Sequence, residues 1–150
     1  MRRRRRGPLA SPASAPSLGV AAGVAMCVAV FLPWYQANIG RVFQAHESTG
    51  WEATGVAKVV LALGIVAAAA SLALAFDAQG LVPLDAGLAR GLGWVLLLAS
   101  AAAAALVGYR LIVLPGDNPD LLSREIGLFL AMAAALVGTV AGVSQLALRS

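Results

Sequence analysis

Four long stretches of the chain contain no charged residue, and short polar segments separate them. These stretches are residues 7–40, 59–76, 91–109 and 126–148. A charge-free apolar stretch of roughly 18 or more residues is long enough to cross a hydrocarbon core about 30 Å thick. The pattern therefore predicts four membrane-spanning helices.

The spans are expected at about 18–35, 53–76, 91–114 and 126–148. Trp34 and Tyr35 end the first span, where aromatic side chains commonly anchor a helix at the membrane interface. The predicted fold class is an all-α integral membrane protein, a four-helix transmembrane bundle built from two helical hairpins. Residues 1–17 form a separate tail, and residues 18–150 form the membrane domain.

Composition agrees with this class. Hydrophobic residues make up 60% of the chain and charged residues only 12%, which lies outside the range usual for soluble proteins. The alternative is a soluble, alanine-rich helical bundle. A protein of this size has too much surface for its volume to hide so many apolar side chains from water.

The N-terminal tail combines a basic run with Pro8, Pro12 and Pro16, which interrupt helices, so we expect it to be disordered. The run consists of Arg2, Arg3, Arg4, Arg5 and Arg6. It resembles the start of a signal peptide, but the proline-rich spacer and the FLPWY end of the apolar stretch favour an uncleaved first helix. The net charge of +4 is concentrated in this run. We therefore expect contact with anionic lipid or an orientation signal, and no nucleic-acid partner.

Orientation follows from the basic residues, which are retained on the cytoplasmic side. An N-in, C-in arrangement places the arginine run 2–6, Arg90 and Arg149 inside. Four basic residues then lie outside: Arg41, Lys58, Arg110 and Arg124. The asymmetry depends on the N-terminal run.

Polar residues near the outer ends of the spans are the candidate site. Lys58 and Arg110 lie shallow within spans two and three, and charged residues inside spans often mark function. The alternative is that their long side chains extend to the headgroups. Carboxylates at the same level are available for pairing. The predicted outer-face polar cluster consists of Lys58, Arg110, Glu52, Glu125 and Trp51.

The chain lacks the residues that most catalytic, metal-binding and proton-coupled functions need. Cys27 is the single cysteine and His46 the single histidine, which makes a poor zinc site. Asp117 and Asp120 in PGDNPD fit a turn better than a cation site. No carboxylate lies at mid-membrane depth, as proton-coupled carriers would require. We expect no enzyme activity, no cofactor and no metal.

Each span offers small residues at four-residue spacing, which lets helix backbones approach closely in lipid. The positions are Gly19, Gly23 and Cys27; Gly64 and Ala68; Ser100, Ala104 and Gly108; and Ala134, Gly138 and Gly142. Packing within the chain is the simpler interpretation, and a homodimer face is the other. For Ser71, Ser100, Thr139, Ser144 and Gln145, we expect packing roles.

Four short motifs support a resemblance: FLPWYQ, STGWEATG, YRLIVLPG and REIGLFLAM. Together they resemble a family of small four-span membrane proteins that is widespread in actinobacteria, over most of residues 18–148. The resemblance implies a multi-pass protein of a bacterial plasma membrane. Such relatives often carry an acidic residue early in the second span, where this chain has Lys58.

The leading functional hypothesis is a non-enzymatic accessory or structural membrane protein, acting through helix–helix or outer-loop contacts with a membrane-protein partner or a second copy. The alternative is an oligomeric small transporter or channel subunit. The two differ in the interior: an accessory protein should have a dry centre packed with alanine and glycine. A carrier should line a wet path with Ser100, Thr139 or Gln145.

Overall fold

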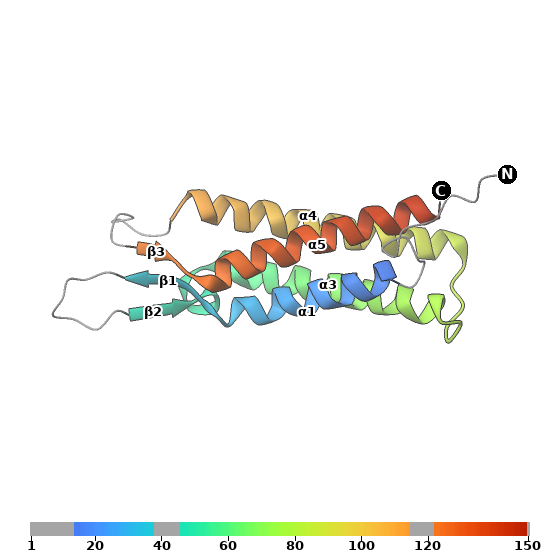
Figure 1. Ribbon diagram of the computed structural model, residues 1–150, viewed down its shortest axis with the longest axis horizontal. Coiled ribbons are helices and arrows are strands. Elements are labelled where there is room, and N and C mark those ends of the chain that lie inside the picture. The colour runs from blue at the N-terminus through green and yellow to red at the C-terminus, as the bar shows by residue number, and fades with distance from the viewer. Residues whose placement is uncertain (1–13, 38–45, 115–121, 150) are drawn as a thin grey trace, which may run out of the picture.

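Four long helices lie side by side, and a small sheet stands beyond one end of them (Figure 1). The computed structural model describes residues 14–37, 46–114 and 122–149. The long helices are α1 (Ser14–Val30), α3 (Gly55–Ala78), α4 (Ala86–Ile112) and α5 (Ile126–Leu148). We call these four the helical body. A single turn, α2 (Gly50–Ala53), precedes α3.

Three of these helices are long and apolar enough to cross a membrane. They are α3, α4 and α5, with 24, 27 and 23 residues. At about 1.5 Å per residue, each exceeds the roughly 30 Å of a hydrocarbon core. The structure therefore confirms a mostly helical chain and indicates a multi-pass membrane protein. Helix α1 has 17 residues and falls short of the same length criterion.

The first helix begins and ends earlier than the predicted span of 18–35. It starts at Ser14, because Pro16 falls in its first turn, where a missing N–H costs nothing. Its last turn closes through the Phe31 N–H, which donates to the Val28 carbonyl at 3.0 Å. Pro33 then starts a strand. Residues 14–17 of the predicted tail are thus helical, and residues 1–13, with the arginine run, lie outside the described residues.

The other helices follow the predicted spans more closely, and capping side chains set the starts of α3 and α4. Thr54 accepts a hydrogen bond from the Ala57 N–H at 3.3 Å and starts α3. Asp85 accepts one from the Leu88 N–H at 2.9 Å, so α4 begins at Ala86, before the predicted residue 91. The bounds of α5 match the prediction, 126–148.

A three-stranded antiparallel sheet corrects the all-α prediction. Its strands are β1 (Pro33–Ala37), β2 (His46–Thr49) and β3 (Leu122–Arg124), in the order β2-β1-β3. Strands of three to five residues leave almost no alternating pattern in a sequence, and β1 pairs with β3 from the far end of the chain. We refer to this side of the molecule as the sheet end. The C-terminus and the α3–α4 connection lie at the opposite end (Figure 1).

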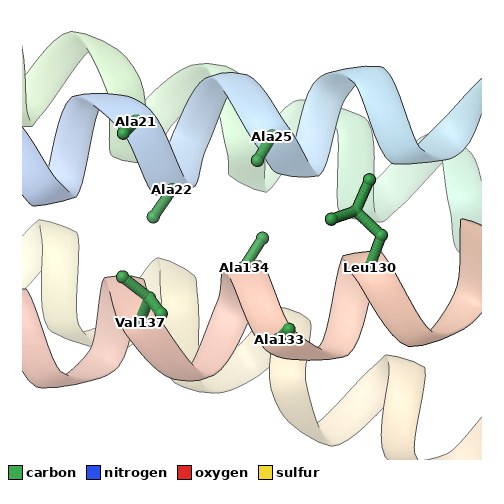
Figure 2. Close-up of a pocket in the computed structure, with 7 residues that line it drawn as sticks. All are labelled: Ala21, Ala22, Ala25, Leu130, Ala133, Ala134 and Val137. Carbon is green, nitrogen blue, oxygen red and sulfur yellow. The ribbon is translucent and has the colours of Figure 1, made fainter.

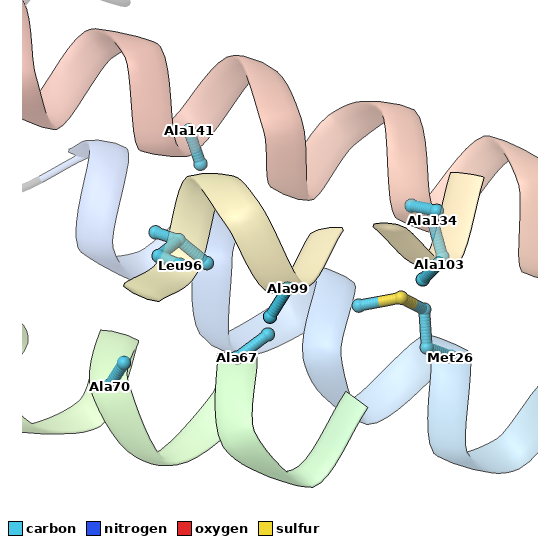
Figure 3. Packing of buried hydrophobic residues seen from close by; sticks show 9 residues of the cluster. Met26, Ala67, Ala70, Leu96, Ala99, Ala103, Ala134 and Ala141 are labelled. Atoms are coloured by element: carbon cyan, nitrogen blue, oxygen red, sulfur yellow. The ribbon is translucent and has the colours of Figure 1, made fainter. Parts of the chain in front are cut away.

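The interior of the helical body is built mainly from alanine. Helix α1 packs against α3 and α5, and α4 packs against the same two helices. Figure 3 shows one cluster in which the small side chains of several helices meet around Met26 and Leu96. Larger side chains such as Val24, Leu98 and Val140 face outward. This distribution suits lipid, which is as apolar as leucine, so that helices associate through close packing.

Glycines mark where the helices approach most closely. A Cβ on Gly23 would lie 2.6 Å from the Ala68 nitrogen, and one on Gly142 would lie 2.7 Å from the Leu97 Cα. Both neighbours are backbone atoms of another helix, so even one methyl group would push the helices apart. The predicted role of small residues in packing within the chain is confirmed at these contacts.

Candidate functional site at the sheet end

The predicted polar cluster lies at the sheet end, and two of its members touch. Lys58, in the first turn of α3, places its Nζ 4.9 Å from the centroid of the Trp51 ring. Phe31 stacks on the same Trp51 ring, and the two ring centroids lie 6.1 Å apart. All three side chains are exposed. A cation over an indole and a stacked aromatic pair together form an amphipathic surface.

The two carboxylates of the cluster accept local hydrogen bonds instead of pairing with the cations. Glu52 forms a capping box with Thr49 and accepts hydrogen bonds from its N–H at 3.4 Å and its Oγ1 at 3.2 Å. Glu125 accepts a hydrogen bond from the Ser123 Oγ at 3.4 Å and precedes α5. Within the part of the chain that the structure describes, the ion pair found lies elsewhere, between Arg149 and Asp77.

Trp34 closes the sheet end of the helical body. Its side chain is 0% exposed, and its Nε1–H donates to the Ala29 carbonyl at 2.7 Å. Two glycines make room for the indole: a Cβ on Gly50 would lie 2.5 Å from its Cε2, and one on Gly127 would lie 2.8 Å from its Cδ1. The sequence predicted an interface anchor at this position, whereas the structure buries the indole inside the protein. Residues of FLPWYQ, STGWEATG and REIGLFLAM thus meet around one ring.

A bulge in β1 allows the next residue to be buried as well. Pro33 pairs with Thr49 and Tyr35 pairs with Ser48, so Trp34 is the additional residue between two successive pairs. Side chains normally alternate between the faces of a strand, and a bulge interrupts that alternation. Trp34 and Tyr35 therefore both enter the same buried cluster, which corrects the interface role predicted for Tyr35 too.

Tyr35 lies near two arginines, and we call Tyr35, Arg110 and Arg124 the tyrosine–arginine cluster. Tyr35 is 2% exposed, and burial raises the pKa of its hydroxyl above the usual value of 10.0, while the positive charges of Arg110 and Arg124 act against that rise. Neither the Tyr35 hydroxyl nor the Arg110 Nε has a hydrogen-bond partner among the described residues, although both atoms are buried. The sequence analysis placed Arg110 in the candidate site but took Tyr35 as an interface anchor and Arg124 as an outer charge, because the strand register that joins these two was not visible in the sequence.

Polar groups inside the helical body divide into two kinds. The hydroxyls of Thr139 and Ser144 donate to the carbonyls of Ala135 and Val140, each at 2.8 Å. Both bonds lie within α5, so each hydroxyl is satisfied by its own helix, which agrees with the packing role expected for both residues. The remaining three, Ser71, Ser100 and Gln145, are buried, and each has a side-chain atom without a hydrogen-bond partner in the described chain.

The end opposite the sheet carries an ion pair that the sequence did not indicate. The Arg149 Nη2 donates to the Asp77 Oδ2 at 2.8 Å, and the Asp77 Oδ1 accepts from the Leu84 N–H at 3.0 Å. Arg90 Nη2 donates to the Arg149 carbonyl at 3.3 Å. These contacts tie the ends of α3, α4 and α5 together, so we assign them a structural role.

An apolar pocket lies between α1 and α5 (Figure 2). Its volume is about 270 Å³, and it is lined by Ala21, Ala22, Ala25, Leu130, Ala133, Ala134 and Val137. No lining side chain carries a polar atom, so the pocket offers only van der Waals contact. It therefore provides no catalytic or ligand-orienting group.

No three His, Cys, Asp or Glu side chains gather among the described residues. The side chain of His46 and the residues Asp117 and Asp120 lie outside that description. Comparison with known proteins found no matching family model and no curated protein with a significant match. The resemblance to the actinobacterial family stays a prediction.

Proposed function

We propose that the protein is a non-enzymatic, accessory or structural protein of a bacterial plasma membrane, which acts through helix–helix or outer-face contacts. The observation that carries the proposal is the closure of the helical body by Trp34, above an interior packed with alanine. A body whose interior is packed mainly with alanine and is sealed at one end favours a scaffold over a conduit.

We also propose four crossings with both termini inside. Helix α1 runs antiparallel to α3, because Gly19 lies against Ser71 and Gly23 against Ala68. Its 17 residues extend roughly 26 Å, and the apolar Phe31 and Leu32 continue it towards the sheet end. The arginine run 2–6 precedes this helix, so the positive-inside rule places its start in the cytoplasm, where the run can contact anionic lipid.

The outer-face contact that fits this role is the exposed surface formed by Phe31, Trp51 and Lys58. Aromatic side chains are enriched in protein interfaces, where they often contribute most of the binding energy. The experiment is affinity capture of the full chain from gently solubilised native membranes. We expect a partner protein or a second copy to be recovered with the wild-type chain and lost with the Trp51→Ala, Lys58→Gln double variant.

A matched control changes the opposite end of the molecule. Arg90→Gln removes one exposed positive charge there and should leave recovery unchanged. Recovery of no partner with the wild-type chain would count against the accessory role.

The alternative, an oligomeric transporter or channel subunit, is favoured by one observation. Ser71, Ser100 and Gln145 place unpartnered polar atoms inside the described helical body, where a substrate or water could bind them. Purified protein in sealed vesicles tests this alternative with an ion-flux and a small-solute assay. Flux that Ser71→Ala or Ser100→Ala abolishes would establish it and overturn the accessory role.

A further inference from the structure

The sheet end contains a second feature that the proposed function does not use. We propose that Tyr35, Arg110 and Arg124, the tyrosine–arginine cluster, bind a phosphate group at the depth of the lipid headgroups. The ligand is either the phosphate of an anionic phospholipid or a soluble phosphate compound, and the chemistry that recognises it is the same. This inference goes beyond the accessory role and does not depend on it.

The sheet register brings the first two members together. Tyr35 of β1 is the direct cross-strand partner of Arg124 of β3. Residues directly opposite each other in an antiparallel pair project from the same face of the sheet, with their Cβ atoms about 4.5–5.5 Å apart. Tyr35 enters the buried cluster on that face, and Arg124 is exposed at its margin. The guanidinium of Arg124 therefore lies where it can reach a ligand from the solvent side.

Helix α4 supplies the third member. Val107 is fully buried in the same cluster as Tyr35, and Arg110 follows it by three residues, which places both on one face of the helix. The Nε of Arg110 is buried without a partner in the described chain. The charge of Arg110 acts on the Tyr35 hydroxyl together with that of Arg124. The Cζ of Arg110 lies 5.5 Å from the centroid of the neighbouring Tyr109 ring. Two cations on two different elements thus act electrostatically on one buried hydroxyl.

The class of ligand follows from the guanidinium groups of Arg110 and Arg124 and from the Tyr35 hydroxyl. A planar guanidinium forms paired hydrogen bonds with phosphate or carboxylate oxygens, and no ion pair with a carboxylate is present for either arginine among the described side chains. The nearby Glu125 accepts from Ser123 instead. A neutral tyrosine hydroxyl donates a further hydrogen bond. Buried polar atoms normally have partners, so the unpartnered Tyr35 hydroxyl and Arg110 Nε point to a bound acceptor.

The depth of the cluster favours phosphate over carboxylate. Helix α4 ends at Ile112 and α5 begins at Ile126, so the sheet lies just beyond the apolar ends of both helices. Lipid phosphates occupy this level of a bilayer. Basic pockets between membrane helices are known to bind anionic lipid headgroups.

The test measures lipid and phosphate binding to the full chain in neutral detergent. The arginine run 2–6 is changed to glutamine in every sample, so that the tail does not contribute. Phosphatidylglycerol binding is measured by native mass spectrometry against phosphatidylcholine, and inorganic phosphate binding by calorimetry. Arg124→Gln and Tyr35→Phe should each weaken binding, the first about tenfold, because each removes one hydrogen bond to a charged group. Arg90→Gln, an equal charge change at the other end, should have less than a twofold effect.

Each result supports or overturns the proposal. Loss of phosphatidylglycerol binding in both variants identifies a lipid headgroup, whereas loss of inorganic phosphate binding identifies a soluble phosphate compound. If Arg124→Gln and Tyr35→Phe bind both probes as the starting chain does, while circular dichroism shows them folded, the site does not exist.

Discussion

The indole of Trp34 fits the sheet end because two positions around it have no side chain. Gly50 and Gly127 both face its ring, and the Ala29 carbonyl accepts its N–H. Burial of a large aromatic side chain contributes several kcal/mol at about 25 cal/mol per Å² of apolar surface. The sequence displayed all of these residues, but tryptophan near the end of a span is more often an interface anchor. Their convergence depends on contacts between distant segments, which no local pattern records.

Replacing Gly127 with alanine should disrupt this closure. The new Cβ would lie 2.6 Å from the Pro33 carbonyl oxygen as well as against Trp34, and a backbone atom cannot move aside cheaply. We expect a loss of about 1–3 kcal/mol in unfolding free energy, measured as a lower thermal midpoint in detergent. Gly91→Ala is the control, because a Cβ there meets nothing within 4 Å; it should gain about 0.5–1 kcal/mol. Equal effects of the two changes would contradict the tight fit around Trp34.

The hydroxyl of Tyr35 should make stability depend on pH in the alkaline range. An unfolded tyrosine ionises near pH 10, whereas burial raises the pKa of Tyr35 in the folded chain. Above about pH 10 the unfolded chain therefore loses a proton that the folded chain keeps. The stabilising contribution is complete below that pH and is lost as pH rises towards the folded value. Thermal midpoints measured from about pH 9 to 11 should fall more steeply for the wild type than for Tyr35→Phe, and parallel curves would exclude the effect.

At the scale of elements, the prediction succeeded where a helix is long and failed where the chain changes direction. The bounds of α5 agree with the predicted 126–148, because a long charge-free stretch has few alternatives in lipid. Helix α1 ends at Val30 because the chain turns into β1, whose pairing with β3 joins segments far apart in the sequence. The same pairing explains why the candidate site was only partly visible. Lys58, Trp51 and Arg110 were assigned to the site from their predicted depth in the membrane alone. Tyr35 and Arg124 could be assigned to it only from the pairing register of β1 and β3.

The contact between α1 and α3 should tolerate no extra methyl group at Gly23. The added Cβ would meet the backbone of Ala68 at 2.6 Å, so the two helices would have to separate along their length. We expect Gly23→Ala to cost about 1–3 kcal/mol, again measured as a lower thermal midpoint in detergent. Val24→Ala, at the next position, shortens a side chain that faces outward and should change stability by less than about 0.5 kcal/mol. A larger loss in Val24→Ala than in Gly23→Ala would contradict the observed packing.

The whole molecule separates its chemistry along its long axis. One end has the aromatic and cationic surface, the closed Trp34 site and the tyrosine–arginine cluster, and the other has the Arg149–Asp77 ion pair near the C-terminus. Between them, the described interior is alanine-rich and the outward faces carry large apolar side chains. Because the two ends carry different groups, they would contact different partners if they lie on opposite sides of a membrane. The proposed function therefore depends on which end faces the cytoplasm.

The N-in, C-in arrangement predicts different labelling of three positions in intact cells. With Cys27→Ser as background, single cysteines replace Ser11 in the tail, Gln79 after α3 and Val113 after α4; the last two are exposed at opposite ends of the molecule. A membrane-impermeant maleimide should label the Val113→Cys chain directly and the other two only after permeabilisation. The arginine run holds the start of α1 on the cytoplasmic side. Because the helices that follow run antiparallel to one another, this orientation also fixes the side of the membrane on which each later connection lies. Labelling of Ser11→Cys together with Val113→Cys would mean that α1 does not cross the membrane, and a full reversal of the pattern would invert the orientation.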